Sequence, residues 1–318
     1  MIELRHLRTL TALRDTGSLV EAAERVFLTQ SALSHQIKDL EHKLGLELFV
    51  RKTKPVEFTT AGQRLLHLAE DILPQIRNTE REITRLAAGA VGRLNIAIEC
   101  HSCFQWLMPS LDRYRADWPE VELDLASGFN FAPLPALRSG ELDLVITANP
   151  KPLPGISYVP LFSYESVLAV SNQHPLTQKP YLEASDLADQ TLICYPVDKD
   201  MLDIFVQFLD PAEVEPAAIR HAELTVMMMQ LVASGRGVCA LPNWALDEYT
   251  SRGYVTAKSM SQTGIWCTLY AAVRNDQTKA KYMMDFLTTA RETSAATLVG
   301  VKQVDQQGAP LKAPEDCL

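Results

Sequence analysis

The chain has 318 residues, of which 47% are hydrophobic and 22% are charged, values close to those of ordinary globular proteins. That length predicts two or three domains, each large enough to bury a core. No apolar run reaches the roughly 18 residues of a membrane-spanning helix, and the first residues, charged from Glu3, do not form a secretory signal. Six cysteines are too few for a disulfide scaffold. We therefore expect a cytoplasmic protein without a membrane partner.

The net charge of −9 is unevenly distributed. The first 65 residues contain 10 Lys and Arg against 8 Asp and Glu, a net charge of +2, so the remainder carries −11. An acidic surface repels phosphate, which excludes a chain that coats nucleic acid along its whole length. A nucleic-acid contact confined to the N-terminal fifth is compatible with this asymmetry.

The first 60 residues predict short helices with tight joints. Leu4, Leu7, Leu10 and Leu13 form a helical stripe that ends near Gly17. Ser18 followed by Glu21 is typical of a capping box and predicts a second helix over residues 19–26. A third helix is predicted from Thr29 or Gln30 to Gly45.

The third segment has two different faces. Leu33, Ile37, Leu40 and Leu44 make an apolar stripe. The opposite face carries polar side chains that can bond base edges: Gln30, Ser31, Ser34, His35 and Lys38. Together with the preceding helix this pattern favours a helix-turn-helix, and the basic residues Arg51 and Lys52 would contact phosphate from an adjoining wing. A small helical bundle with a solvated polar face is the alternative.

Residues 60–88 predict one long helix whose apolar face needs a partner, which favours dimerisation, with a hinge at 89–92. From residue 93 the pattern changes to a mixture of strands and helices. Strands are predicted over 94–99, 121–126, 142–147, 167–170, 191–195, 237–241 and 269–273. Helices are predicted over 104–117, 202–209, 226–234 and 280–289. This order predicts an α/β domain of two lobes with a mostly parallel sheet. Residues 299–318 are predicted to be a disordered tail.

A run with fixed spacing covers much of the first 62 residues. It comprises Gly17-Ser18-Leu19, Ala22-Ala23, Thr29 to Glu41, Leu44-Gly45, Leu48 to Arg51 and Thr59 to Gly62. This run closely resembles the N-terminal domain of LysR-type transcriptional regulators. The resemblance implies a winged helix-turn-helix domain (1–59), a linker helix that dimerises (60–88), a hinge (89–92) and a two-lobed effector domain like the periplasmic solute-binding proteins (93–298).

The same resemblance implies the partners. They are double-stranded DNA at an interrupted palindromic promoter site, a small-molecule effector and RNA polymerase, bound by a homodimer or homotetramer. A narrower resemblance, in residues 96–107, 140–145 and 269–274, points to a subgroup of the family that controls methionine-biosynthesis genes with homocysteine as co-effector. The alternative is a regulator of another regulon, either with a different small-molecule effector or as a thiol redox sensor that uses Cys100 and Cys103. No cofactor is implied. The chain shows no Gly-x-Ser-x-Gly elbow, phosphate loop or paired carboxylates, so we do not expect an enzyme.

Cys100-His101-Ser102-Cys103 allows three interpretations. It is compatible with half of a zinc site, although no second Cys-x-x-Cys exists, and with a thiol redox sensor. The favoured interpretation places it between a strand and a helix, where Ser102 with Gln105 forms a capping box and backbone N–H groups face the ligand side of the sheet.

Family position implies the effector site, and the residues predicted to bind the effector are His101, Ser102, Phe129, Thr147 and Thr225. Ser102, Thr147 and Thr225, the last as a helix N-cap, offer hydroxyl groups to a carboxylate, although plain capping or turn chemistry would also explain them. Glu99 and Asp198 are alternative partners for an ammonium group.

Overall fold

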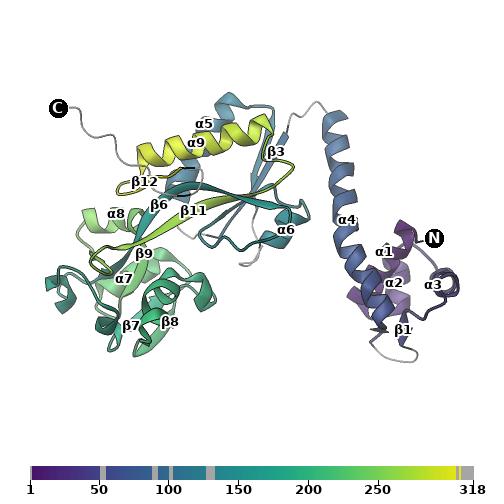
Figure 1. Cartoon of the computed structure of the whole chain (residues 1–318), viewed down its shortest axis with the longest axis horizontal. Helices are drawn as coiled ribbons and strands as arrows, with labels where there is room; N and C mark the ends of the chain where they lie inside the picture. Colours follow the sequence, from purple (N-terminus) through teal and green to yellow (C-terminus); the bar gives the residue numbers. More distant parts are fainter. Residues whose placement is uncertain are drawn as a thin grey trace. The chain divides into compact units, whose positions relative to one another are not determined.

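The computed structural model describes residues 2–50, 55–87, 92–99, 103–126, 133–305 and 308. The chain divides into an N-terminal unit of residues 1–89 with 139–141, and a C-terminal unit that contains the remaining residues. Figure 1 labels the elements of each unit. No helix in these described ranges is long and apolar enough to cross a membrane.

The N-terminal unit contains four helices and a two-stranded ribbon within its described residues. They are α1 (Leu4–Thr16), α2 (Leu19–Arg25), α3 (Gln30–Leu44), β1 (Phe49–Val50), β2 (Glu57–Phe58) and α4 (Thr60–Ala87). Leu10 and Leu33 are fully buried, as the predicted stripes require, although Leu4 and Leu44 of the same stripes are exposed. The two strands pair antiparallel, with Phe49 opposite Phe58.

The helix ends of this unit differ in part from the predicted caps. Gly17 and Gly45 end α1 and α3 in the left-handed region, with φ of 64° and 69°, which glycine adopts without strain. The Thr29 hydroxyl accepts the N–H of Ala32 and caps α3. Ser18 stands at the N-cap of α2, but its side chain makes no capping hydrogen bond. The predicted capping box at Ser18 is therefore wrong.

The C-terminal unit is built on an eight-stranded sheet. Its strands are β3 (Gly92–Ile98), β4 (Val121–Leu125), β5 (Leu144–Thr147), β6 (Ile156–Val170), β9 (Cys239–Pro242), β10 (Thr256–Ser259), β11 (Ile265–Arg274) and β12 (Lys302–Gln303). The order is β10-β6-β11-β5-β3-β4, with β9 and β12 also paired to β6. β3, β4 and β5 are parallel, whereas every pairing of β6 and β11 is antiparallel. The prediction of a mostly parallel sheet is therefore wrong.

Two lobes are joined by the long strands β6 and β11 (Figure 1). The first lobe contains β3, β4 and β5 with α5 (Phe104–Asp117), α6 (Leu134–Arg138) and α9 (Lys281–Thr297). The second contains β9, β10, α7 (Thr225–Ala233), α8 (Asn243–Ser251) and a small parallel sheet of β7 (Thr191–Cys194) and β8 (Ala218–His221). Short turns complete it: η1 (Pro175–Gln178), η2 (Ala184–Leu187), η3 (Lys199–Met201), the π-helix η4 (Phe205–Leu209) and η5 (Asp210–Ala212).

The segment after α9 departs from the predicted tail. β12 pairs with β6, opposite Ser163 and Phe162, and Val304 is buried. Residues 302–304 are therefore held on the sheet by strand pairing and by the burial of an apolar side chain, so the prediction of disorder is wrong for them. Residues 306, 307 and 309–318 lie outside the described ranges.

A buried ion pair anchors the first lobe. The Asp143 carboxylate accepts hydrogen bonds from Arg93 Nε at 2.5 Å and from the Asn95 backbone N–H at 3.0 Å, and Arg274 Nη2 lies 3.6 Å away. The side chains of Asp143, Arg93 and Arg274 are 9%, 12% and 17% exposed. Two guanidinium groups and a backbone donor thus compensate the desolvated carboxylate.

We predict that Asp143→Asn lowers the free energy of unfolding of the C-terminal unit by about 3 kcal/mol, because a neutral amide no longer balances the buried charge of Arg93 and leaves Arg274 with the exposed Asp276, 3.6 Å from its Nε. Urea unfolding followed by tryptophan fluorescence measures this, since Trp106, Trp118, Trp244 and Trp266 all lie in that unit. Asp112→Asn is the control, because Asp112 is 78% exposed. Equal stability of the two variants would contradict the prediction.

Candidate functional site

The outer face of α3 presents the polar side chains predicted for it. Gln30, Ser31, His35 and Lys38 are exposed and Ser34 is half-buried, whereas Leu33, Ile37 and Leu40 are buried below them. His35 Nδ1 lies 3.1 Å from Asp39 Oδ2, one turn further along. The helix therefore offers amide, hydroxyl and imidazole groups on one exposed face, while its other face holds it to the unit.

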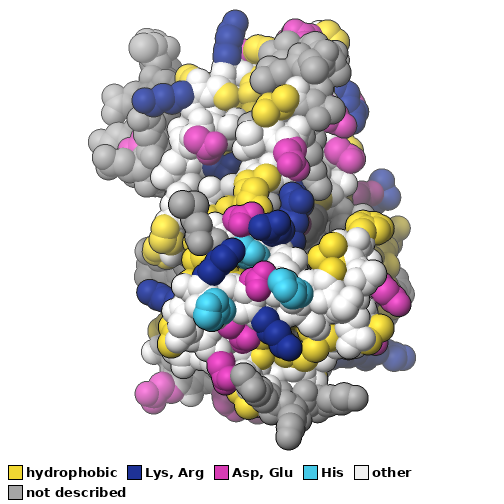
Figure 2. All heavy atoms as spheres, turned by 90° about the vertical axis from the view of Figure 1, so that its right-hand side faces the viewer, with side chains coloured by type: hydrophobic (Ala, Val, Ile, Leu, Met, Phe, Trp, Pro, Cys, Tyr) yellow, Lys and Arg dark blue, Asp and Glu magenta, His cyan; other side chains and the backbone are white. Residues whose placement is uncertain are grey.

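Basic groups gather around this helix. Figure 2 looks onto that side of the molecule and shows histidine, lysine and arginine side chains together, with acidic side chains among them. Lys38, His42 and Lys43 on α3 are exposed. Arg51 and Lys52, predicted to contact phosphate, lie outside the described residues, between β1 and β2.

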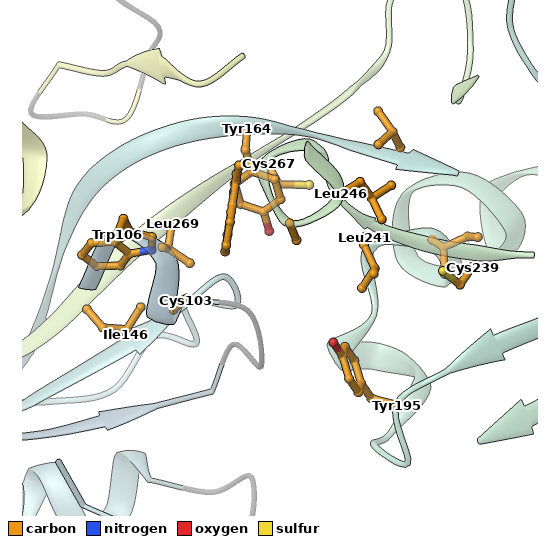
Figure 3. Close-up of a cluster of buried hydrophobic side chains, with 14 of the residues drawn as sticks. Cys103, Trp106, Ile146, Tyr164, Tyr195, Cys239, Leu241, Leu246, Cys267 and Leu269 are labelled. Atoms are coloured by element: carbon orange, nitrogen blue, oxygen red, sulfur yellow. The ribbon is translucent and has the colours of Figure 1, made fainter. Parts of the chain in front are cut away.

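A cavity of about 120 Å³ lies between the lobes of the C-terminal unit. The first lobe contributes Glu99, Thr147, Ala148 and Asn149, and β6 contributes Tyr164 and Ser166. The second lobe closes it with Tyr195, Val197, Met201, Leu202, Asp203, Ile204, Ala240, Leu241 and Pro242. Tyr164 and Tyr195 both line this cavity, and in Figure 3 their phenol groups point toward one another.

Glu99 follows β3 directly, and its backbone N–H bonds the Ile146 carbonyl oxygen at 2.9 Å. Its carboxylate accepts a hydrogen bond from the side chain of Thr147. The Thr147 hydroxyl also accepts the Asn149 N–H at 3.0 Å. Burial raises the pKa of Glu99, against the lowering effects of Thr147 and the charge of Lys151.

Asp203 reaches the cavity from the second lobe, just before η4. It accepts hydrogen bonds from the Tyr164 hydroxyl and from Gln207 Nε2, each at 3.2 Å, and Gln207 Nε2 also lies 3.2 Å from Cys267 Sγ. Burial raises the pKa of this carboxyl, although hydrogen bonds with Cys267, Tyr164 and Gln207 oppose the change. The π-helix η4 that follows Asp203 supports a functional role for this segment, because π-helical turns are rare and often adjoin functional sites.

A polar contact also joins the lobes near the cavity. Asn149 Nδ2 donates to the Asp200 carbonyl oxygen at 3.2 Å, and Lys151 Nζ lies 3.2 Å from Asp200 Oδ2. Lys151 and Asp200 are both more than half exposed. The contact therefore lies at the solvent side and holds the lobes in their present spacing with weak, screened interactions.

The predicted effector residues are distributed unevenly. Thr147 lines the cavity and is fully buried, but its one hydroxyl proton is used on Glu99. Thr225 is the first residue of α7, not its N-cap, which is Leu224; its hydroxyl lies 2.6 Å from that of Tyr195. The N-cap prediction for Thr225 is wrong because the helix begins one residue earlier. His101, Ser102 and Phe129 lie outside the described residues.

Other predictions for this region are changed by the structure. Asp198 is the N-cap residue of η3 and is not among the cavity residues, whereas Asp203 and Tyr164 line it and were not predicted. The sequence did contain a signal for Asp203, because its carboxylate stands between Leu202 and Ile204 in an apolar segment. Cys103 is fully buried, is not part of a disulfide, and is the N-cap residue of α5. Within the described part of the chain, no group of three or more His, Cys, Asp or Glu side chains could hold a metal.

Comparison with known proteins agrees with both units. Residues 4–63 match the bacterial regulatory helix-turn-helix protein family, lysR type, and residues 87–295 match the LysR substrate-binding domain. The chain belongs to the LysR family. It is accordingly a transcriptional regulator, with a helix-turn-helix for DNA and a domain for a small-molecule effector, and not an enzyme.

Individual relatives cover nearly the whole chain. The HTH-type transcriptional regulator MetR of Haemophilus influenzae is 45% identical over 94% of this chain and 97% of its own length. MetR of Escherichia coli K12 is 44% identical over 96% and 95%. Among solved structures, the regulatory domain of MetR from N. meningitidis is 42% identical with a TM-score of 0.63, and it covers 67% of this chain and 99% of that domain.

We predict that the two cavity carboxyls destabilise the ligand-free fold once the pH rises above the ordinary carboxyl range. Their pKa values are raised, so the folded chain binds more protons than the unfolded chain. Stability then falls as pH rises from the ordinary carboxyl range through the raised values. The double variant Glu99→Gln with Asp203→Asn should lose this fall and be more stable than the unmodified chain above the raised pKa values.

The test is urea unfolding by tryptophan fluorescence at about pH 5 and about pH 8. The gain in stability of the double variant should be larger at the higher pH. Asp210→Asn, an exposed carboxyl of the same lobe, is the control and should leave the pH dependence unchanged. Identical pH slopes for the double variant and the unmodified chain would contradict the prediction.

Proposed function

We propose that this regulator controls methionine-biosynthesis genes in the cytoplasm and that homocysteine, bound between the two lobes, is its co-effector. The observation that carries the proposal is the inter-lobe cavity, whose half-buried carboxyls and buried hydroxyls suit a small polar amino acid. The similarity to MetR regulators over more than nine-tenths of the chain supports the choice of regulon. In this proposal the unplaced residues His101, Ser102 and Phe129 complete the site with Thr147, and Thr225 acts through Tyr195.

The DNA contact is proposed from the face of α3. Gln30, Ser31, Ser34, His35 and Lys38 read base edges in the major groove, while Arg51 and Lys52 bind the backbone. Dimerisation through α4, on which Ile83 is exposed, pairs two such helices on an interrupted palindrome in a homodimer or homotetramer. The bound complex then acts on RNA polymerase.

The effector can shift this complex only through its different affinities for the two lobe arrangements, a coupling of about 1–3 kcal/mol in typical cases. A ligand that contacts both lobes favours the closed arrangement. The proposal therefore requires a ligand that binds residues of the first and second lobes at once.

We predict that Ser34→Ala and His35→Ala each weaken binding to a DNA site selected by the unmodified protein about tenfold, with little effect on random DNA, because they remove base contacts. Lys52→Ala should weaken both and lower the slope of log affinity against log salt by about one. Fluorescence anisotropy with labelled duplexes measures these affinities. His67→Ala, an exposed histidine of α4, is the control. Equal losses on selected and random DNA would remove the base-reading role.

We predict saturable, selective binding of L-homocysteine to the reduced full-length protein. Titration calorimetry measures it, with methionine, cysteine and O-acetylserine as competitors of similar size. Selective binding of one of those compounds instead would leave the LysR assignment intact and overturn the choice of co-effector. An unchanged heat for Cys100→Ser with Cys103→Ser would show that neither thiol is needed for ligand binding.

A further inference from the structure

The joint between α2 and α3 exposes a large aromatic side chain. Phe27 is 95% exposed, more than any other large hydrophobic residue that the structure describes. The rings of Phe49 and Phe58 in the same unit are half-buried, and their centroids lie 4.9 Å apart. A single exposed apolar side chain is common on protein surfaces, so the exposure alone carries no conclusion. The backbone of Phe27 supplies a second observation.

The backbone of Phe27 adopts the left-handed conformation, with a φ of 58°. Its N–H donates to the Glu24 carbonyl oxygen at 3.1 Å, and the N–H of Leu28 donates to the Ala23 carbonyl oxygen at 2.9 Å. These two bonds form a Schellman motif, in which Phe27 occupies the position that glycine usually takes. A side chain with a β carbon strains the backbone in this conformation.

The same unit uses glycine where its other helices end in this conformation. Gly17 follows α1 with a φ of 64°, and Gly45 follows α3 with a φ of 69°. At Phe27 the backbone is strained, and the ring gains almost no packing within the chain because it lies in solvent. Strained residues of this kind are concentrated at functional sites. The outlier therefore points to a partner for the ring outside the chain.

Phe27 adjoins the end of α3 that faces DNA in a helix-turn-helix. A recognition helix enters the major groove with its N-terminal residues at the base edges. Gln30 and Ser31 are the first residues of α3 and are exposed, and Phe27 precedes the N-cap residue Thr29 by two positions. The hydroxyl groups of Thr29 and Ser31 lie 3.1 Å apart. The joint thus continues the surface that the first turn of α3 presents.

We infer that Phe27 is a specificity-determining residue of the DNA contact, and that its ring packs against the 5-methyl group of a thymine beside the bases read by α3. The inference rests on the proposed role of α3 as the recognition helix. The 5-methyl group of thymine is an apolar group that the major groove presents, and phenylalanine is among the side chains that contact it. Cytosine lacks this methyl group, so the contact favours thymine at one position of each half-site.

The test combines a change in the protein with the loss of one methyl group from the DNA. Phe27→Ala and Phe27→Gly remove the ring from the full chain. Each thymine of a duplex site selected by the unmodified protein is replaced in turn by deoxyuridine, which lacks only the 5-methyl group. Fluorescence anisotropy gives each dissociation constant. Tyr254→Ala, which removes an exposed aromatic side chain of the C-terminal unit, is the control.

For the unmodified chain we expect deoxyuridine at one position of each half-site to weaken binding roughly threefold to fivefold per methyl group, the effect of burying one such group. Phe27→Ala should weaken binding to the selected site about tenfold. It should also be insensitive to deoxyuridine at that position, because the ring and the methyl group form a single contact. Tyr254→Ala should respond to both duplexes as the unmodified chain does.

Phe27→Gly distinguishes a lost contact from a damaged fold. Glycine takes the left-handed position without strain, so hydrogen exchange of residues 19–44 should be at least as slow in this variant as in the unmodified chain. Its affinity for the selected site should nevertheless fall as that of Phe27→Ala does. Faster exchange in both variants, together with weaker binding, would assign the loss to the fold and overturn the inference.

The outcomes separate this inference from the proposed function. If Ser34→Ala and His35→Ala weaken binding to the selected site but Phe27→Ala does not, the inference is overturned and the role of α3 stands. If Phe27→Ala loses affinity but remains as sensitive to every deoxyuridine as the unmodified chain, the ring contacts no thymine methyl and the inference is overturned. If Phe27 and one thymine are coupled while Ser34→Ala and His35→Ala act equally on random DNA, the inference stands and the base-reading role of those two residues fails.

Discussion

The antiparallel pair of β6 and β11 is the constraint on which the C-terminal unit depends. The two strands pair from Ile156 opposite Arg274 to Ser166 opposite Ile265, with a shift of register between Leu269 and Tyr270. β11 adds β5 of the first lobe to the sheet, while β6 adds β9 and β10 of the second. Because the same two strands serve both lobes, a residue in the middle of β6, such as Tyr164, lies at the floor of the cleft and can bond a group from either side.

The packing around these strands continues between the lobes. Trp106 of α5 meets Phe162 of β6 edge to face at 5.7 Å, and Trp244 of α8 lies 6.4 Å from Phe162 and 6.3 Å from Tyr164. Figure 3 shows Trp106 and Tyr164 in this cluster. Large rings in contact have few alternative packings. Tyr164 is therefore held from two sides, by the ring of Trp244 and by the carboxylate of Asp203.

The carboxyl groups of this unit differ in their effect on stability, and the difference comes from the groups that surround them. Asp143 is buried between guanidinium groups and a backbone N–H, so its charge is compensated and it stabilises the first lobe. Glu99 and Asp203 are held by neutral donors, and burial raises their pKa. The same kind of side chain thus stabilises the fold where cations face it and costs stability where burial is opposed mainly by neutral donors.

Local pattern in the sequence determined the helices of the N-terminal unit and the extent of α5. The helical period separates the buried Leu33, Ile37 and Leu40 from the exposed side chains of α3, and residues 104–117 form α5 as predicted. The family was also evident there, because its motif lies in one continuous stretch. These features depend on residues a few positions apart, which a periodicity or a motif records directly.

The tertiary structure alone decided which side chains meet in the cleft. Glu99, Tyr164 and Asp203 belong to three separate segments, and the two lobes that share the antiparallel pair of β6 and β11 bring them to one cavity. The first half of β6, the pairing of β12 and the use of the Thr147 hydroxyl on Glu99 were hidden for the same reason. Strand partners and their register are set by contacts between distant segments, so the local sequence does not record them.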